Sequence, residues 1–356
     1  MTTPWQQMAE HSPTVLWNDS ATEVELSAAI GWGAVGATCN PVIALSALKA
    51  EPELWAERIR QYAAAHPTET EDEIGWAMVR QLSVDAAKLL EPAFDRYGGR
   101  NGRLSIQTDP RFYRDTERLT EQAVEFSKLA RNIIVKIPAT AAGIPAIEEA
   151  VYRGVNVNAT VSFTVAQAVA VGEAVERGLN RREAEGLDIS SMGHVCTIMV
   201  GRTDDWMKQV IKRDNLAVDP EVCEWAGVAA LKRAYEIYQE RGFRTRMLSA
   251  AFRNHQHWAE FVGGDVVISP PFAWQQKANE SGMTGEARMH IPVDSDVLTQ
   301  LRAIGEEFDK AYEPAGMSAS EFDSYGATVR TLRQFLAANN ELETFVRDVL
   351  LPNPDL

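Results

Sequence analysis

The stretch Asn132-Ile-Ile-Val-Lys-Ile-Pro138 carries apolar side chains at every position from 133 to 137 except one. Successive side chains of a strand point to opposite sides, so a run without a polar face predicts a strand covered on both sides. Such strands belong to parallel sheets packed between helices. The stretch therefore predicts an α/β fold, and it leaves one residue, Lys136, to be explained.

Seven further apolar runs occur along the chain, and long amphipathic segments separate them. The eight predicted strands span residues 14–19, 34–40, 104–109, 132–138, 155–162, 195–201, 245–252 and 265–270. Strands alternating with helices indicate βα units and a parallel sheet. Eight such units favour a closed (β/α)8 barrel of the TIM type over an open doubly wound sheet.

Segments outside the eight units predict additional helices. Residues 49–97 contain two helical patterns without a strand between them. Residues 272–356 read as a C-terminal helical extension packing on the barrel, in which residues 322–340 would form a helix closing over it. No linker or repeat divides the sequence, so residues 1–356 are predicted to form a single domain.

Local sequence marks the start of two of these helices. Ser20-Ala-Thr-Glu23 fits a capping box directly after the first strand. Asn40 followed by Pro41 fits an N-cap and a first helical residue after the second strand. Both signals place a helix where a βα unit requires one.

Composition excludes several classes of function. The formal net charge of -15 argues against a nucleic-acid partner, because phosphate backbones require a basic face. The three cysteines form no C-x-x-C motif, so neither a disulfide framework nor a zinc site is indicated. The first residues do not resemble a signal peptide, and no apolar run approaches the roughly 20 residues that span a bilayer. We expect a cytoplasmic protein with no membrane contact and no bound metal.

Lys136 places an ammonium group in a strand that offers no counter-ion, and lysine is almost never fully buried unless paired. One interpretation is structural: the side chain reaches solvent, or forms an ion pair with Asp19. The other is chemical: burial lowers the pKa, and a neutral amine can attack a ketone to form an imine. The imine draws electrons from the adjacent carbon–carbon bond, so aldol chemistry at this lysine needs no organic cofactor.

Polar residues recur at every second position on three other predicted strands. The rows are Ser105, Gln107 and Asp109; Asn156, Asn158 and Thr160; and Ser249, Ala251 and Arg253. Each row faces one side, near the strand ends where catalytic groups of barrel enzymes lie. Arg202 and Arg253 follow neighbouring late strands and suggest a clamp for a substrate phosphate. Asp19 ends the first strand, either as a general acid and base or as the cap of its helix.

Six segments match a known family in order and spacing. They are GATCNP (36–41), VKIPAT (135–140), GVNVNATVSFTVAQA (154–168), IMVGR (198–202), YEIYQERGFRTRMLSAAFRN (235–254) and GGDVVISP (263–270). Over residues 13–345 the chain resembles the transaldolase family. The resemblance implies a barrel of the class I aldolase type, sugar phosphate substrates, a possible homodimer, and a Schiff-base lysine on the fourth strand.

The resemblance also implies a role for each matching residue. Lys136 would form the imine, and Asp19 would move protons and contact substrate hydroxyls. The other matches are residues that hold a dihydroxyacetone unit and a catalytic water (Asn40, Asn158 and Thr160) and arginines that bind the sugar phosphate (Arg202 and Arg253).

Three positions depart from the family pattern. Gln107 replaces the usual third-strand glutamate; it can orient a water but cannot accept its proton, so Asp19 would carry more of the proton transfer. The related fructose-6-phosphate aldolase branch also has glutamine here. The sixth-strand motif reads Thr197-Ile-Met199-Val-Gly-Arg202, with Met199 in place of an aromatic residue. The phosphate-site motif reads Ser249-Ala-Ala-Phe-Arg253, which lacks one hydroxyl donor.

These observations predict transaldolase-type transfer of a dihydroxyacetone unit between a ketose phosphate and an aldose. Lys136 would attack the C2 ketone, while Asp19 assists with a water held by Gln107 and Thr160. One alternative is an aldolase that releases dihydroxyacetone. Another is a sugar-phosphate-binding paralogue without catalysis, which would keep the two arginines but would not need the amine.

Overall fold

The eight predicted runs form a closed barrel of parallel strands in chain order in the computed structural model, which describes residues 3–282 and 284–355. The strands are β1 (Val15–Asn18), β2 (Ala34–Thr38), β3 (Arg103–Gln107), β4 (Ile133–Pro138), β5 (Val157–Thr160), β6 (Val195–Ile198), β7 (Arg246–Ala250) and β8 (Val266–Ser269). Strand β8 pairs with β1 and closes the sheet. The (β/α)8 barrel is confirmed.

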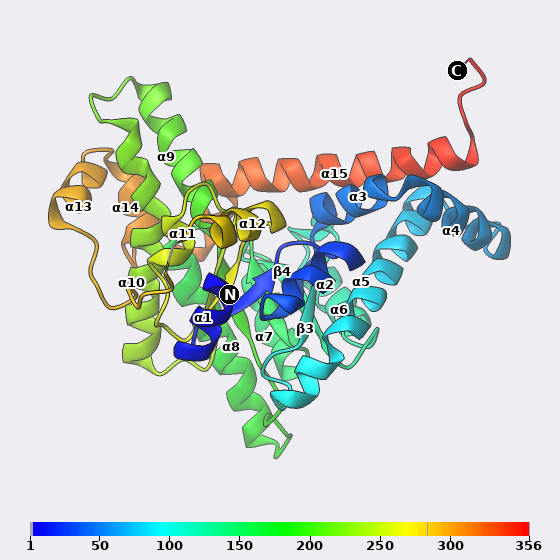
Figure 1. Cartoon of the computed structure of the whole chain (residues 1–356), viewed down its shortest axis with the longest axis horizontal. Coiled ribbons are helices and arrows are strands. Elements are labelled where there is room, and N and C mark those ends of the chain that lie inside the picture. The colour runs from blue at the N-terminus through cyan, green and yellow to red at the C-terminus, as the bar shows by residue number, and fades with distance from the viewer. Residues whose placement is uncertain (1–2, 283, 356) are drawn as a thin grey trace.

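Helices surround the barrel and connect its strands (Figure 1). The connecting helices are α2 (Glu23–Gly31), α3 (Pro41–Ala50), α6 (Thr116–Phe126), α7 (Gly143–Tyr152), α8 (Val165–Ala184), α9 (Val200–Asp214), α10 (Ala226–Arg241) and α11 (Gln256–Ala259). The two helices predicted before the third strand are α4 (Pro52–Ala65) and α5 (Glu71–Arg96). The shorter elements are α1 (Pro4–His11), η1 (Pro110–Phe112) and η2 (Pro220–Trp225). None of the described helices is both long and apolar enough to cross a membrane.

The C-terminal segment is helical, as predicted. It contains α12 (Phe272–Glu280), α13 (Ser295–Arg302), α14 (Glu306–Tyr312), η3 (Ala319–Ser324) and α15 (Gly326–Leu350). Figure 1 shows α15 running across one end of the molecule, and it contacts α3, α4, α5 and α9. Its buried residues Leu332, Phe335, Leu342 and Val346 recur at helical spacing, which gives it one apolar face toward these helices.

One of the two predicted helix starts is correct. The Asn40 Oδ1 accepts from the backbone N–H of Ile43 at 3.0 Å, and Pro41 is the first residue of α3. The capping box at Ser20 is wrong, because α2 begins at Glu23 with Thr22 as its N-cap. The Ser20 hydroxyl instead accepts from the N–H of Thr22 at 3.3 Å. A serine can satisfy its neighbouring backbone in a local turn as readily as in a cap.

Apolar side chains from five strands fill the inside of the barrel. They are Trp17, Ile134, Val195, Leu248, Ala250 and Val267. Trp17 is the largest, and Gly36 on the neighbouring strand β2 makes room for it. A Cβ added at Gly36 would lie 2.4 Å from Trp17 Nε1. The interior is thus packed with side chains, and a ligand can enter only from an end.

We expect Gly36→Ala to lower the free energy of unfolding by about 1–3 kcal/mol, because the added methyl group overpacks the interior against Trp17. Denaturant unfolding of the two proteins measures the difference. Gly31→Ala is the matched control, since a Cβ there meets no atom within 4 Å. Equal unfolding midpoints for Gly36→Ala and the native chain would mean that Trp17 moves aside without cost.

Candidate active site

Gln107, Lys136 and Asn158 lie side by side on three neighbouring strands. Gln107 pairs with Lys136 across β3 and β4, and Lys136 pairs with Asn158 across β4 and β5. Paired residues of parallel strands project to the same face, so the amine lies between two amides. All three side chains are buried. The barrel therefore holds one amine among neutral polar groups.

The Lys136 side chain fits neither structural interpretation. It is 5% exposed, so it does not reach out to solvent. Among the described residues no carboxylate oxygen lies within 4.0 Å of its Nζ, so it forms no ion pair. Burial lowers the pKa of Lys136, and the more distant Asp19 carboxylate and Cys39 thiol oppose that change without reversing it. This environment favours the neutral amine.

Asp19 follows β1 and remains partly exposed at the barrel mouth. The Thr38 hydroxyl donates to Asp19 Oδ1 and lies 3.4 Å from the Ser269 hydroxyl. Burial raises the pKa of Asp19, while Lys136, Thr38 and Arg202 act in the opposite direction. Because Thr22 is the N-cap of α2, Asp19 is not the cap of that helix. A carboxyl group with a raised pKa is suited to exchanging protons.

A short hydrogen-bond chain orients Asn158. Its Nδ2 donates to the Ser105 hydroxyl at 3.0 Å, and its Oδ1 accepts from the Thr197 hydroxyl at 2.8 Å. Gln107 differs, because its buried Oε1 has no hydrogen-bond partner among the described residues. Native proteins leave few buried oxygens unpartnered, and this Oε1, next to Lys136, is an acceptor available to a substrate hydroxyl. Thr160, on the same face of β5 as Asn158, is also buried.

Three arginines from distant parts of the chain form a cluster at the mouth of the barrel. Arg202 in α9, Arg253 after β7 and Arg330 in α15 line a cavity of about 200 Å³. Arg202 donates to the Thr331 hydroxyl at 3.2 Å, and its buried Nε has no partner in the described part of the chain. Burial lowers the pKa of Arg202 to about 10, and the charges of Arg253 and Arg330 act in the same direction. Arg253 already pairs with Asp205, which lines the same cavity, so an anion would chiefly compensate Arg202 and Arg330.

Comparison with known proteins places the chain in a family. The family model described as Transaldolase/Fructose-6-phosphate aldolase matches residues 16–321. The chain belongs to this family. It is 35% identical over 234 residues to Transaldolase 1 of Streptomyces avermitilis, which covers 63% of this chain and 60% of that relative. It is 33% identical over 214 residues to the transaldolase of Mycobacterium ulcerans, covering 58% of this chain and 55% of that relative.

Another relative, the transaldolase of Kocuria rhizophila, is 30% identical over 248 residues, with 67% of this chain and 66% of the relative covered. The chain thus matches somewhat less than two thirds of the length of these transaldolases. Within the family barrel, the structure brings Lys136, Asp19, Gln107, Asn158, Thr160, Thr197, Arg202 and Arg253 to the interior and its mouth.

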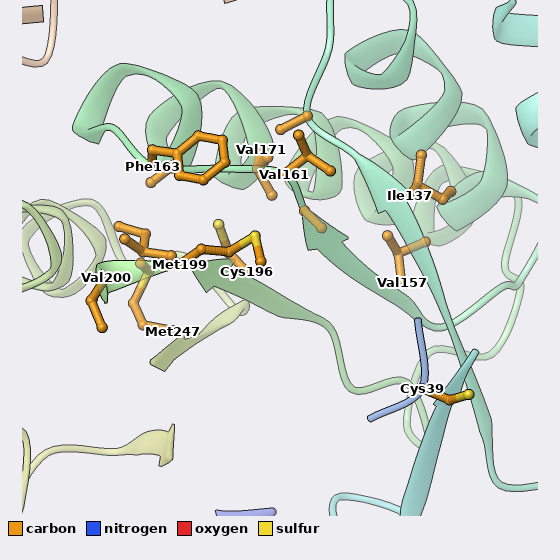
Figure 2. Packing of buried hydrophobic residues seen from close by; sticks show 14 of the residues in the cluster. Cys39, Ile137, Val157, Val161, Phe163, Val171, Cys196, Met199, Val200 and Met247 are labelled. Carbon is orange, nitrogen blue, oxygen red and sulfur yellow. The ribbon is translucent and has the colours of Figure 1, made fainter. Parts of the chain in front are cut away.

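Two predicted binding residues do not join this group. The Ser249 hydroxyl donates to the backbone oxygen of His257 at 2.8 Å, while its strand neighbours Leu248 and Ala250 pack in the interior. Ser249 therefore points away from Lys136. Met199 packs in the hydrophobic core at the end of β6, and Figure 2 shows it near Phe163. Asn40 lines a small cavity together with Gln107 and Asn339 of α15.

Sequence patterns did not reveal the pair of side chains that supports Arg253. His257 Nε2 lies 2.8 Å from Asp204 Oδ2, and His257 Nδ1 accepts from the backbone N–H of Arg253 at 3.0 Å. Both side chains are buried, and Asp204 also accepts from the N–H of Gly227. The pair joins α9 to the loop that carries Arg253. It fixes the backbone at one side of the arginine cluster.

Proposed function

We propose that this protein transfers a dihydroxyacetone unit from a ketose phosphate to an aldose through a Schiff base on Lys136. The observation that carries the proposal is a buried lysine without a carboxylate partner, placed between Gln107 and Asn158. The arginine cluster at the mouth supplies the charge for the substrate phosphate. Family membership supports a transaldolase or aldolase activity.

The proposed reaction gives a role to the amine and to the carboxyl group. The neutral Lys136 amine attacks the C2 carbonyl, and the addition product takes a proton from the Asp19 carboxyl and loses water to leave an iminium ion. Asp19 takes the proton of the C4 hydroxyl as the C3–C4 bond breaks, and the bonding electrons move to the iminium nitrogen. The aldose leaves, and the resulting enamine attacks the acceptor aldehyde while Asp19 returns the proton. Hydration of the new iminium ion frees the ketose and restores the amine.

Reduction with borohydride converts an imine into a stable covalent adduct, so it tests the proposed imine directly. The native chain is incubated with fructose 6-phosphate and reduced, and intact mass followed by peptide mapping locates the adduct. We expect one adduct, on Lys136. No adduct with any ketose phosphate tested would defeat the proposal and leave the non-catalytic binding protein as the better description. An adduct on another lysine only would also defeat it, by assigning the imine to that lysine.

The aldolase remains the second candidate, because Gln107 is an amide where the usual family glutamate would be a carboxylate. The two activities differ in the fate of the enamine. A transferase needs the acceptor aldehyde to turn over, whereas an aldolase protonates the enamine and releases free dihydroxyacetone. We expect product formation to depend on acceptor. Dihydroxyacetone accumulating at one rate with and without acceptor would favour the aldolase.

Arg202→Met is expected to lower kcat/KM for phosphorylated substrates by about tenfold to a hundredfold, the loss that follows removal of a charge-assisted hydrogen bond. The kinetics of a ketose phosphate and of the same ketose without phosphate are compared. Arg213→Met, on the same helix but exposed and paired with Asp214, is the matched control. An equal loss for both substrates would assign Arg202 to packing on Phe335, over whose ring its guanidinium lies.

A further inference from the structure

A second polar pocket lies at the end of the barrel opposite to Lys136. Its cavity of about 440 Å³ is bordered by segments 98–100, 190–194 and 243–247 and by Asp265. His194 and Thr245 directly precede β6 and β7, so these segments lie where strands begin. We call this cavity the floor pocket. The proposed reaction makes no use of it.

Three buried side chains at the floor pocket carry polar atoms without partners. Arg103 Nε and Nη1, His194 Nε2 and Thr245 Oγ1 have no hydrogen-bond partner among the described residues, and the three residues are at most 4% exposed. His194 and Thr245 line the cavity, and Arg103 lies against Gly193 at its edge. Native proteins rarely leave buried polar atoms unpaired.

The unpaired groups are hydrogen-bond donors. The backbone N–H of Val157 donates to His194 Nδ1 at 3.2 Å, so the hydrogen of the neutral ring lies on Nε2. A guanidinium can only donate, and the threonine hydroxyl can donate. A ligand that satisfies all three side chains must therefore supply acceptor oxygens.

Positive charge accompanies these donors. Within residues 3–282 and 284–355, neither Arg103 nor Arg246 has a carboxylate oxygen within 4.0 Å. Arg103 donates to the backbone oxygen of Ser191, and Arg246 donates to the backbone oxygen of Arg100 and to Asn101 Oδ1. Because these acceptors are neutral, neither arginine forms an ion pair, and only the more distant Asp265 carboxylate partly offsets the charge of Arg246.

The neighbouring ionic groups do not cancel this charge. Arg100 pairs with Asp265, and Arg244 pairs with Glu176 and Glu183. Burial and the charge of Arg246 lower the pKa of Arg103 to about 10, and burial with the nearby arginines lowers the pKa of His194 to about 3. The pocket thus resists further positive charge and would be stabilised by an anion.

We infer that the floor pocket binds a phosphoryl dianion, presented by inorganic phosphate or by a small phosphate ester. Phosphate supplies several acceptor oxygens and negative charge at once, which matches the donors of His194 and Thr245 in the lining and the charge of Arg246 beside them. Arg103, behind Gly193, adds to the positive field. The cavity falls within the size range of small-molecule sites, roughly 300–1,000 Å³. Tyr235 and Phe243 add an apolar wall that an organic group could contact.

Hydrogen exchange of the whole chain tests this site. The probes are inorganic phosphate and glycerol 1-phosphate, which lack a carbonyl group and cannot form an imine with Lys136. We expect both probes to protect segments 98–104, 190–195 and 243–247, separately from any protection at the arginine cluster. Stronger protection by glycerol 1-phosphate would identify an ester as the ligand, and stronger protection by phosphate would identify the free ion.

Two variants separate the floor pocket from the arginine cluster. Arg246→Gln should raise the ligand concentration that protects the floor segments by about tenfold to a hundredfold. Protection around Arg202 should persist. Thr245→Val gives a second, smaller change that removes no charge. Arg241→Gln, an exposed arginine of α10 paired with Glu173, should bind as the native chain does. Absent floor protection in the native chain, or protection unchanged in both pocket variants, would overturn the inference.

Discussion

Replacing Lys136 with methionine is expected to abolish the borohydride-trapped adduct and to lower turnover on the order of 10⁴-fold or more, because no other amine can form the imine at that position. Methionine keeps the length and apolar stem of the side chain, so the barrel should still fold. Intact mass after reduction and single-turnover kinetics measure the two effects. Lys128→Met, which removes an exposed lysine before β4, serves as the matched control.

Lys136→Met should also have a higher free energy of unfolding than the native chain, because burying the charged lysine destabilises the native barrel. The folded pKa lies below the ordinary value of 10.5, so the unfolded chain binds more protons between the two values. Native stability therefore rises with pH through that window. The difference in free energy of unfolding between Lys136→Met and the native chain should be largest below the folded pKa and should shrink toward pH 10.5. Its change over that window is about 1.4 kcal/mol for every tenfold difference in proton affinity between the folded and unfolded chains. A variant that is less stable than the native chain would show that the lysine packs favourably.

The fold was predictable because its signals are local. Short apolar runs fix a strand by their length, and the amphipathic segments between them require helices on the outside. Where the signal depended on the position of one turn, prediction was weaker. The Ser20 motif has the spacing of a capping box, but two more residues pass before α2 begins. Spacing alone does not state which of two local hydrogen-bond patterns a serine adopts.

The site was predictable only in part. The alternation of polar and apolar side chains along a strand defines two faces, but it does not say which face points into the barrel. Asn158 and Thr160 share the inner face of β5, as the row predicted, whereas Ser249 lies on the outer face of β7. Gln107 lies beside Lys136 because of the register between β3 and β4, and this register cannot be read from the sequence of either strand alone. Arg330 could not be placed in advance, since it reaches the mouth of the barrel only through the packing of α15.

Asp19→Asn is expected to lower kcat by about 10²–10⁴-fold, the usual contribution of a positioned acid and base. Asparagine has nearly the same shape and can still accept from Thr38, but it cannot take a proton. The Asp19 carboxylate also raises the pKa of Lys136, so its removal should lower that pKa further. The amine would stay neutral to lower pH, and the acid limb of kcat/KM should move in the same direction.

Trapping and turnover together separate Asp19 from Lys136. In Asp19→Asn the amine remains, so borohydride should still capture an imine on Lys136 while carbon–carbon cleavage is slow. Lys136→Met should lose both the adduct and the turnover.

Asp85→Asn removes a half-exposed carboxylate of α5 that pairs with Arg58, and it should change neither the rate nor the pH profile. If Asp19→Asn kept native turnover, another group would have to carry the proton, and the two amides beside Lys136, Gln107 and Asn158, cannot do so. If instead the variant lost the adduct together with turnover, Asp19 would act before cleavage, in forming the imine. Its protonated carboxyl would then be needed to donate the proton with which the hydroxyl group of the first addition product leaves as water.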